Sequence, residues 1–130
     1  MINRENWLDV KEYLDYLDNV RQADPKTVSR VRTLLRYLLE WAGDKPFPRA
    51  AENRQVFPAY LTKTRNDGAA GTLAPATMKK TCEYTRNFFD YIRRAHLRRY
   101  RNISPVWIDT IRPPRSMSMQ SKLRTHEYYT

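Results

Sequence analysis

Hydrophobic residues recur every three or four positions along most of this chain, and no long segment alternates apolar and polar residues as a strand does. Between about residues 6 and 22 this spacing predicts a first helix, with Asn6 as a plausible N-cap. Its acidic residues lie mostly off the apolar stripe, so they are expected outside the core. The stripe comprises Trp7, Val10, Leu14, Leu17 and Val20 or Arg21.

A second helix is predicted to begin at Pro25, because Asp24 is a good N-cap and proline is favoured at the first helical position. Gly43 is expected to end it. Basic residues occupy the outer face: Lys26, Arg30, Arg32 and Arg36. Apolar residues form the inner face: Val28, Val31, Leu34, Leu35, Leu38, Leu39, Trp41 and Ala42.

The middle of the chain is less regular. Phe47 stands between two prolines and is expected to plug into the core. A weaker third helix is predicted between about Glu52 and Thr64, where Pro58 either kinks it or marks its first turn. The glycine-rich residues 66–71 predict a mobile loop. The residues expected to face inward are Val56, Phe57, Tyr60 and Leu61.

A fourth helix is predicted from Pro75 to about Leu97. Ala74 is a poor N-cap, so the first N–H groups of this helix are left available to a phosphate oxygen. A helical turn is expected at residues 106–111, with Trp107 or Ile111 packing back, and an extended linker from residue 116. The apolar positions of the fourth helix are Met78, Cys82, Thr85, Phe88, Phe89 and Ile92.

The second and fourth helices begin almost alike, fifty residues apart. Pro25-Lys26-Thr27-Val28 corresponds to Pro75-Ala76-Thr77-Met78, and aromatic residues end both patterns at Trp41 and Tyr91. Each pattern combines a helix N-terminus, basic residues on one face and an apolar stripe on the other. Two such helices suggest a clamp around something anionic.

Charge strengthens that interpretation. The 130 residues fit one domain and carry 24 Lys and Arg against 14 Asp and Glu, a formal charge of +10. Residues 1–24 carry three basic and six acidic side chains, so the remainder carries +13. The electrostatic field of this positive charge favours binding to nucleic acid over binding to an anionic membrane. No membrane span is evident in the sequence. The plainer alternative is a basic surface that only confers solubility.

The basic residues near the helix starts, together with arginines of the 93–101 run, are the candidate DNA contacts. Cations and helix N-termini hold phosphates, while side chains near a helix start reach base edges in the major groove. The alternatives are solvated helix faces and, for the arginine run, pairing with the acidic first helix. The candidates are Lys26, Thr27, Arg30, Thr77, Lys79, Lys80, Arg86, Arg93, Arg94 and Arg99.

Two other signals have plain explanations. His96-Leu97-Arg98-Arg99, followed by Tyr100, matches a His-x-x-Arg box of phosphoryl transfer, but such a match arises by chance in an arginine-rich segment. Cys82, the lone cysteine, is expected in the core and fits a reducing compartment. No phosphate-binding glycine loop or metal-ligand spacing occurs in the sequence, so no cofactor or metal is expected.

The order of these elements resembles the N-terminal core-binding domain of phage integrases and other tyrosine recombinases. The resemblance covers about residues 6–115. It rests on the paired Pro-x-Thr openings, the Leu38-Leu39-x-Trp41 and Phe88-Phe89-x-Tyr91 endings, Tyr60-Leu61, and Ser104-Pro105 before a proline-bounded exit. Ala74 departs from the pattern, since a serine or similar capping residue is more usual there.

The resemblance implies an all-α, SAM-like orthogonal bundle of four main helices plus a short C-terminal helical turn. Its second and fourth helices would enter the major groove of a recombination site. Residues 1–115 would form this domain, and residues 116–130 would be a linker toward a catalytic domain that this chain lacks. Tyr128 and Tyr129 would then lie too early to be the nucleophile, and the chain itself would not be an enzyme.

The partners implied are double-stranded DNA, the catalytic domain and other recombinase protomers, in the cytoplasm of a bacterium or archaeon. Two other functions remain open. One is a free-standing helical adaptor that binds proteins through its acidic and basic parts. The other is a small phosphoryl-transfer enzyme that uses His96, Arg99 and Tyr100.

Overall fold

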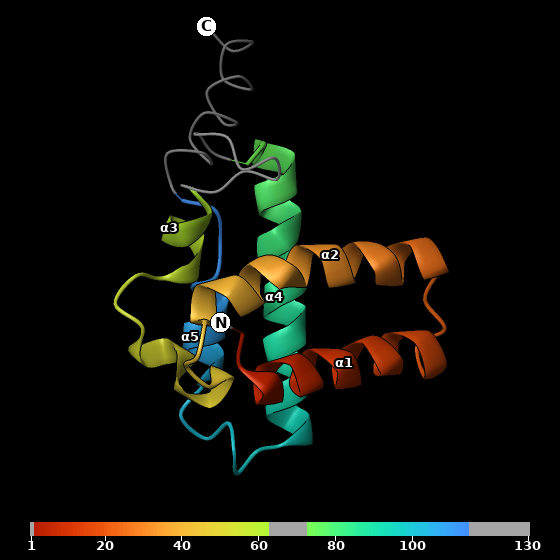
Figure 1. The fold of residues 1–130 in the computed structure, drawn as a ribbon, viewed down its shortest axis with the longest axis horizontal. Helices are drawn as coiled ribbons and strands as arrows, with labels where there is room; N and C mark the ends of the chain where they lie inside the picture. The colour runs from red at the N-terminus through yellow and green to blue at the C-terminus, as the bar shows by residue number, and fades with distance from the viewer. Residues whose placement is uncertain (1, 63–72, 115–130) are drawn as a thin grey trace, which may run out of the picture.

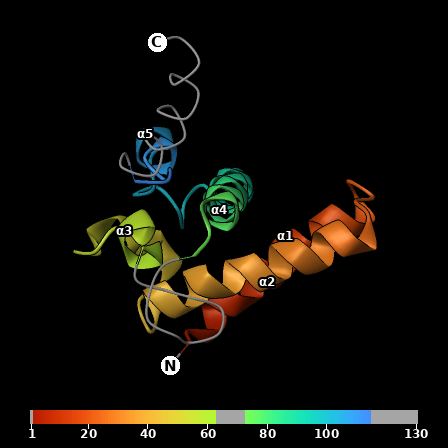
Figure 2. The same ribbon diagram turned by 90° about the horizontal axis from the view of Figure 1, so that it is seen from above.

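The computed structural model describes residues 2–62 and 73–114, and these residues form an all-α structure without a strand. Three helices are long: α1 (Arg4–Asn19), α2 (Pro25–Ala42) and α4 (Pro75–Ala95). Helices α1 and α2 lie side by side as an antiparallel pair, and α4 runs across both on one face of that pair (Figures 1 and 2). The fold is therefore two layers of helices with the core between them.

Helix α1 begins three residues before the position that its predicted N-cap implies. Asn3, not Asn6, is its N-cap, and the Asn3 side chain accepts a hydrogen bond from the Asn6 N–H. Asn6 is itself buried, donates to the carbonyl of Lys45 and accepts from the N–H of Phe47. The prediction was wrong because the two asparagines have the same local propensity, and only the packing of a distant segment assigns Asn6 to the core.

The far end of α1 also differs from the prediction. The helix ends at Asn19, and Val20 is 68% exposed. The buried face instead includes Tyr13 and Asp9, which the apolar stripe had left out.

Helix α2 confirms its predicted bounds. The Asp24 carboxylate accepts from the Lys26 N–H at 2.8 Å, Pro25 opens the helix, and Gly43, at a φ of 56°, follows its last residue. A positive φ is readily adopted by glycine, which explains why the helix stops there. The predicted inner face is buried apart from half-buried Val28, and Tyr37 joins it.

The predicted third helix is replaced by two short pieces. A 3₁₀ helix, η1 (Phe47–Glu52), is followed by a short bent connector and then by α3 (Phe57–Leu61). Pro58 lies in the first turn of α3, where a missing N–H costs nothing, and Val56 is exposed rather than inward. The described residues therefore contain three long helices rather than four.

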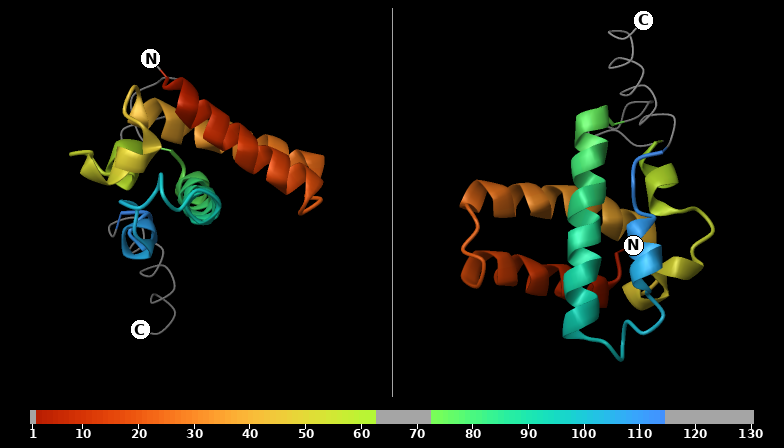
Figure 3. Two further views of the ribbon diagram at one scale, coloured as in Figure 1. Left: turned by 90° about the horizontal axis from the view of Figure 1, so that it is seen from below. Right: turned by 180° about the vertical axis from the view of Figure 1, so that it is seen from behind.

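Helix α4 begins at Pro75 as predicted, and no side chain caps it at Ala74. The chain then turns back through α5 (Pro105–Asp109), which packs beside α4 (Figure 3). Phe89 contacts the Trp107 ring at a centroid distance of 5.2 Å, and Ile111 is buried as well. The sequence predicted that Trp107 or Ile111 packs back, and both do.

Aromatic side chains fill the centre of the core. Phe47 is fully buried against Phe88 and Phe89, at centroid distances of 5.4 and 5.7 Å, which confirms its predicted role. Cys82 is also buried, and burial raises the pKa of its thiol to about 12. It is therefore a core residue rather than a thiolate nucleophile. The predicted loop at residues 66–71 and the linker from residue 116 lie outside the described residues.

Candidate nucleic-acid interface

The first candidate surface is the outer face of α2 near its start. Lys26, Thr27 and Arg30 are all exposed, and neither cationic side chain has a partner among the described residues. Farther along, Arg32 lies over the Trp7 ring and Arg36 pairs with Glu40 at 3.5 Å. Although the Asp24 carboxylate caps this helix start, the Lys26 and Arg30 side chains form no ion pair with another described residue.

The second surface is the start of α4. Lys79 is exposed and has no ion-pair partner within the described ranges, whereas Lys80 pairs with Glu83 at 3.3 Å and lies over the Tyr84 ring. Thr77 is half-buried, and its carbonyl accepts from the Thr81 hydroxyl. Exposed ion pairs contribute little to stability, so phosphate can compete for Lys80.

Two arginines of the candidate set bind the backbone on either side of α5, at Ile103 and Ile111. Arg86 donates from Nη1 to the carbonyl of Ile111 at 2.6 Å, and Arg93 donates from Nε to the carbonyl of Ile103 at 2.9 Å. Both are half-buried. Their guanidinium groups donate to backbone carbonyls that no helix satisfies. Part of the hydrogen-bonding capacity of both arginines is therefore used within the fold and not free for phosphate.

Arg99 lies in the turn that follows α4, and its guanidinium group forms a bidentate pair with Asp9 of α1. Nη1 and Nη2 lie 2.7 and 2.8 Å from the two carboxylate oxygens, and the Asp9 side chain is only 7% exposed. The buried Tyr100 hydroxyl donates to the same carboxylate. Burial first, and then this hydrogen bond, raise the pKa of Tyr100, while the hydrogen bond to Asp9 raises the pKa of Arg99.

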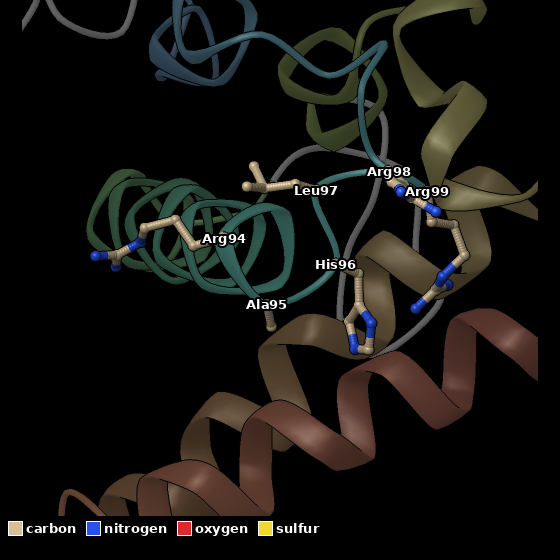
Figure 4. A pocket seen from close by; sticks show the side chains of 6 residues that line it. All are labelled: Arg94, Ala95, His96, Leu97, Arg98 and Arg99. Carbon is tan, nitrogen blue, oxygen red and sulfur yellow. The ribbon is translucent and has the colours of Figure 1, made fainter.

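A second carboxylate of α1 holds the same turn. Glu12 contacts His96 Nε2 at 2.8 Å and accepts from the Tyr91 hydroxyl at 3.2 Å. His96 and Arg99 both point toward α1 in Figure 4, beside a shallow hollow of about 400 Å³ lined by residues 94–99. Each member of the His-x-x-Arg match therefore has a carboxylate partner.

The candidate residues do not form one cluster. The start of α2 lies at the end of the α1–α2 pair where the connector joins the two helices (Figure 1). The start of α4 extends past the edge of α2, and the arginine run lies at the other end of α4. Arg94, in that run, forms only an exposed pair with Asp90. Sequence reasoning missed Asp9, although a signal was present: Asp9, Tyr13 and Tyr16 recur at helical spacing.

Comparisons with known proteins found no matching family model, no matching curated protein and no matching solved structure. Within the described residues, no helix is both long and apolar enough to cross a membrane, and no group of three or more potential metal-ligating side chains occurs. The candidate interface therefore rests on the chain's own geometry and charge.

Proposed function

We propose that this chain is a non-catalytic DNA-binding domain of the kind that tyrosine recombinases use to hold one face of a recombination site. The observation that carries the proposal is the cationic start of α2, where Lys26 and Arg30 are exposed and unpaired among the described residues. Exposed cations that form no ion pair with the described residues are available to release counterions from a phosphate backbone.

The start of α4 supports the same function. Lys79 and Lys80 lie within its first turns, and the helix lacks a side-chain cap at Ala74. Backbone N–H groups and the helix dipole favour an anion there, in addition to the lysines. The long helices cross as two layers, which is consistent with the orthogonal SAM-like bundle, although α3 is short.

Two acidic side chains of α1 are engaged by the segment after α4: Asp9 pairs with Arg99, and Glu12 contacts His96. The bidentate pair with the buried Asp9 carboxylate occupies the Arg99 guanidinium group within the fold, which leaves it less available for phosphoryl transfer.

The experiment is a titration of a random-sequence DNA duplex at several salt concentrations. Phosphate contacts without base readout give dissociation constants on the order of 1–100 μM at physiological salt, and affinity then falls steeply as salt rises. Replacing Lys26 and Arg30 together by alanine is expected to lower the slope of log affinity against log salt by about two units. The Lys79/Lys80 double variant should have a similar effect.

The Arg4→Ala/Lys11→Ala variant is the matched control, because both residues are exposed cations on the acidic helix α1. It should leave the slope unchanged. A salt-independent affinity of the unmodified chain, or an equal loss for this control and the α2 double variant, would overturn the proposal and favour a protein-binding adaptor.

A further inference from the structure

The turn that follows α4 is fixed by two carboxylates one helical turn apart on α1. We call residues 96–101 the arginine turn. Asp9 binds Arg99 and Tyr100 of this turn, and Glu12 binds His96. Glu12 also accepts from Tyr91, in the last turns of α4, so the same carboxylate ties α1 to the helix that precedes the turn.

The two remaining arginines of the turn differ from Arg99. Arg98 and Arg101 are exposed, and neither forms an ion pair or a side-chain hydrogen bond with another described residue. Arg94, just before the turn, has only its exposed pair with Asp90. Asp9 thus neutralises one arginine of the turn while the other two keep their full charge at the surface.

We infer that Asp9 and Glu12 are positioning residues, which hold the arginine turn in the conformation that lets Arg98 and Arg101 bind phosphates of the DNA backbone. This inference rests on the proposed function. Arg98 and Arg101 belong to the arginine run that the sequence already suggested as a DNA contact, whereas Asp9 and Glu12 were not candidates. The two carboxylates would influence DNA binding indirectly: Asp9 holds Arg99 and Tyr100, and Glu12 holds His96.

The physical advantage is preorganisation. Ordering a six-residue turn on binding would cost backbone and side-chain entropy, and that cost would be subtracted from the affinity. A turn already held by a bidentate ion pair and a buried hydroxyl loses less entropy when its exposed arginines meet phosphates. Guanidinium groups suit this contact, because their planar donors match phosphate oxygens.

The first test replaces Arg98 and Arg101 together by alanine and measures duplex affinity against salt. The expected result is a slope about two units smaller and an affinity about 10-fold lower, with an unchanged melting temperature. The Arg4→Ala/Lys11→Ala variant is the control, because it removes the same charge from exposed sites of α1, outside both the turn and α2. Equal losses for the two double variants would overturn the inference.

The second test separates positioning from stability alone. Glu12→Gln makes the chain more positive, so a purely electrostatic effect would tighten DNA binding. Positioning instead predicts about 2- to 10-fold weaker binding, and little further effect when Arg98 and Arg101 are already alanine. Tyr100→Phe, which leaves the net charge unchanged, should behave in the same way.

Unchanged or tighter binding by Glu12→Gln, or an equal effect with and without the two arginines, would overturn the positioning role. The failure of this inference is distinguishable from the failure of the proposed function. If duplex binding depends on salt and on Lys26 and Arg30 but not on Arg98 and Arg101, only this inference fails. If the unmodified chain shows no salt dependence, the proposed function fails with it.

Discussion

The start of α2 and the arginine turn use the same residue type in opposite ways. At the start of α2, Arg30 is exposed and meets no carboxylate among the described residues. In the arginine turn, Arg99 forms a bidentate pair with a carboxylate that is 7% exposed. The difference comes from the acidic helix α1, which presents Asp9 and Glu12 to the end of α4. A cluster of positive residues in a sequence is thus not equivalent to a cationic surface.

The largest expected effect comes from removing the carboxylate beneath Arg99. Asp9→Ala leaves the buried Tyr100 hydroxyl and the Arg99 guanidinium group without their acceptor. Breaking such a pair is expected to lower the free energy of unfolding by about 3–5 kcal/mol, measured by urea denaturation. Asp15→Ala, at an exposed position of the same helix, should stay within about 0.5 kcal/mol. Similar values for both variants would show that the pair contributes little to the fold.

Tyr100→Phe removes one hydrogen bond to Asp9 but keeps the ion pair. Because the acceptor is charged and buried, we expect a loss of about 2 kcal/mol in the free energy of unfolding. The double-mutant cycle with Asp9→Ala should be strongly non-additive, since the two residues share this contact. Additive losses would contradict the network.

The same tyrosine predicts a pH dependence. The folded state raises the pKa of Tyr100 above its ordinary value of 10.0, so the neutral phenol is favoured in the fold. Its contribution is therefore fully present below pH 10 and is lost as the pH rises above 10. Tyr13, whose pKa burial raises to about 12, acts in the same direction. Urea denaturation between pH 8 and pH 11 should show a steeper decline for the unmodified chain than for Tyr100→Phe.

Two neighbouring arginines, Arg93 and Arg94, are expected to differ in how much each stabilises the fold, although both effects are smaller than that of Asp9. Arg93 is half-buried and donates to the carbonyl of Ile103, whereas Arg94 forms an exposed pair with Asp90. Arg93→Ala is expected to lower the free energy of unfolding by about 1–2 kcal/mol, and Arg94→Ala by less than about 0.5 kcal/mol. A larger loss for Arg94→Ala would reverse the assignment of the two side chains.

The smallest effect is expected at His96. Its ring contacts Glu12, but both side chains are partly exposed, His96 at 35% and Glu12 at 40%. His96→Gln should therefore change the free energy of unfolding by at most about 1 kcal/mol in thermal or urea denaturation. A loss as large as that of Asp9→Ala would place the main anchor of the turn at Glu12 instead.

Local signals in the sequence predicted much of the fold. The Asp24–Pro25 start and Gly43 end of α2, the proline start of α4 and the buried Phe47 all depend on the propensities of adjacent residues, and each is confirmed. The start of α1 and the third helix were less predictable. Asn6 is buried by contacts with residues about forty positions away, and the five-residue α3 has too few residues for a periodic pattern.

The candidate site shows the same limit. Charge counts identified the basic faces, and Lys26, Arg30 and Lys79 are exposed as a binding surface requires. The sequence left open whether the arginine run pairs with the acidic helix. It does so at Arg99, because Asp9 lies on the buried side of α1 despite its charge. A buried carboxylate cannot be recognised before its partner, 90 residues away, is placed beside it.

Thermal melting of Arg30→Ala and Arg99→Ala, with and without a DNA duplex, compares the two regions most directly. Both variants lose one positive charge from an arginine. Arg30→Ala should melt at the temperature of the unmodified chain without DNA but gain less from added duplex, because the stabilisation by a bound ligand grows with the logarithm of its concentration divided by Kd. Arg99→Ala should melt about 5–10 °C lower without DNA, since it leaves the buried Asp9 carboxylate without its cationic partner. Equal melting temperatures of the two variants without DNA would contradict the division between a binding arginine and a structural one.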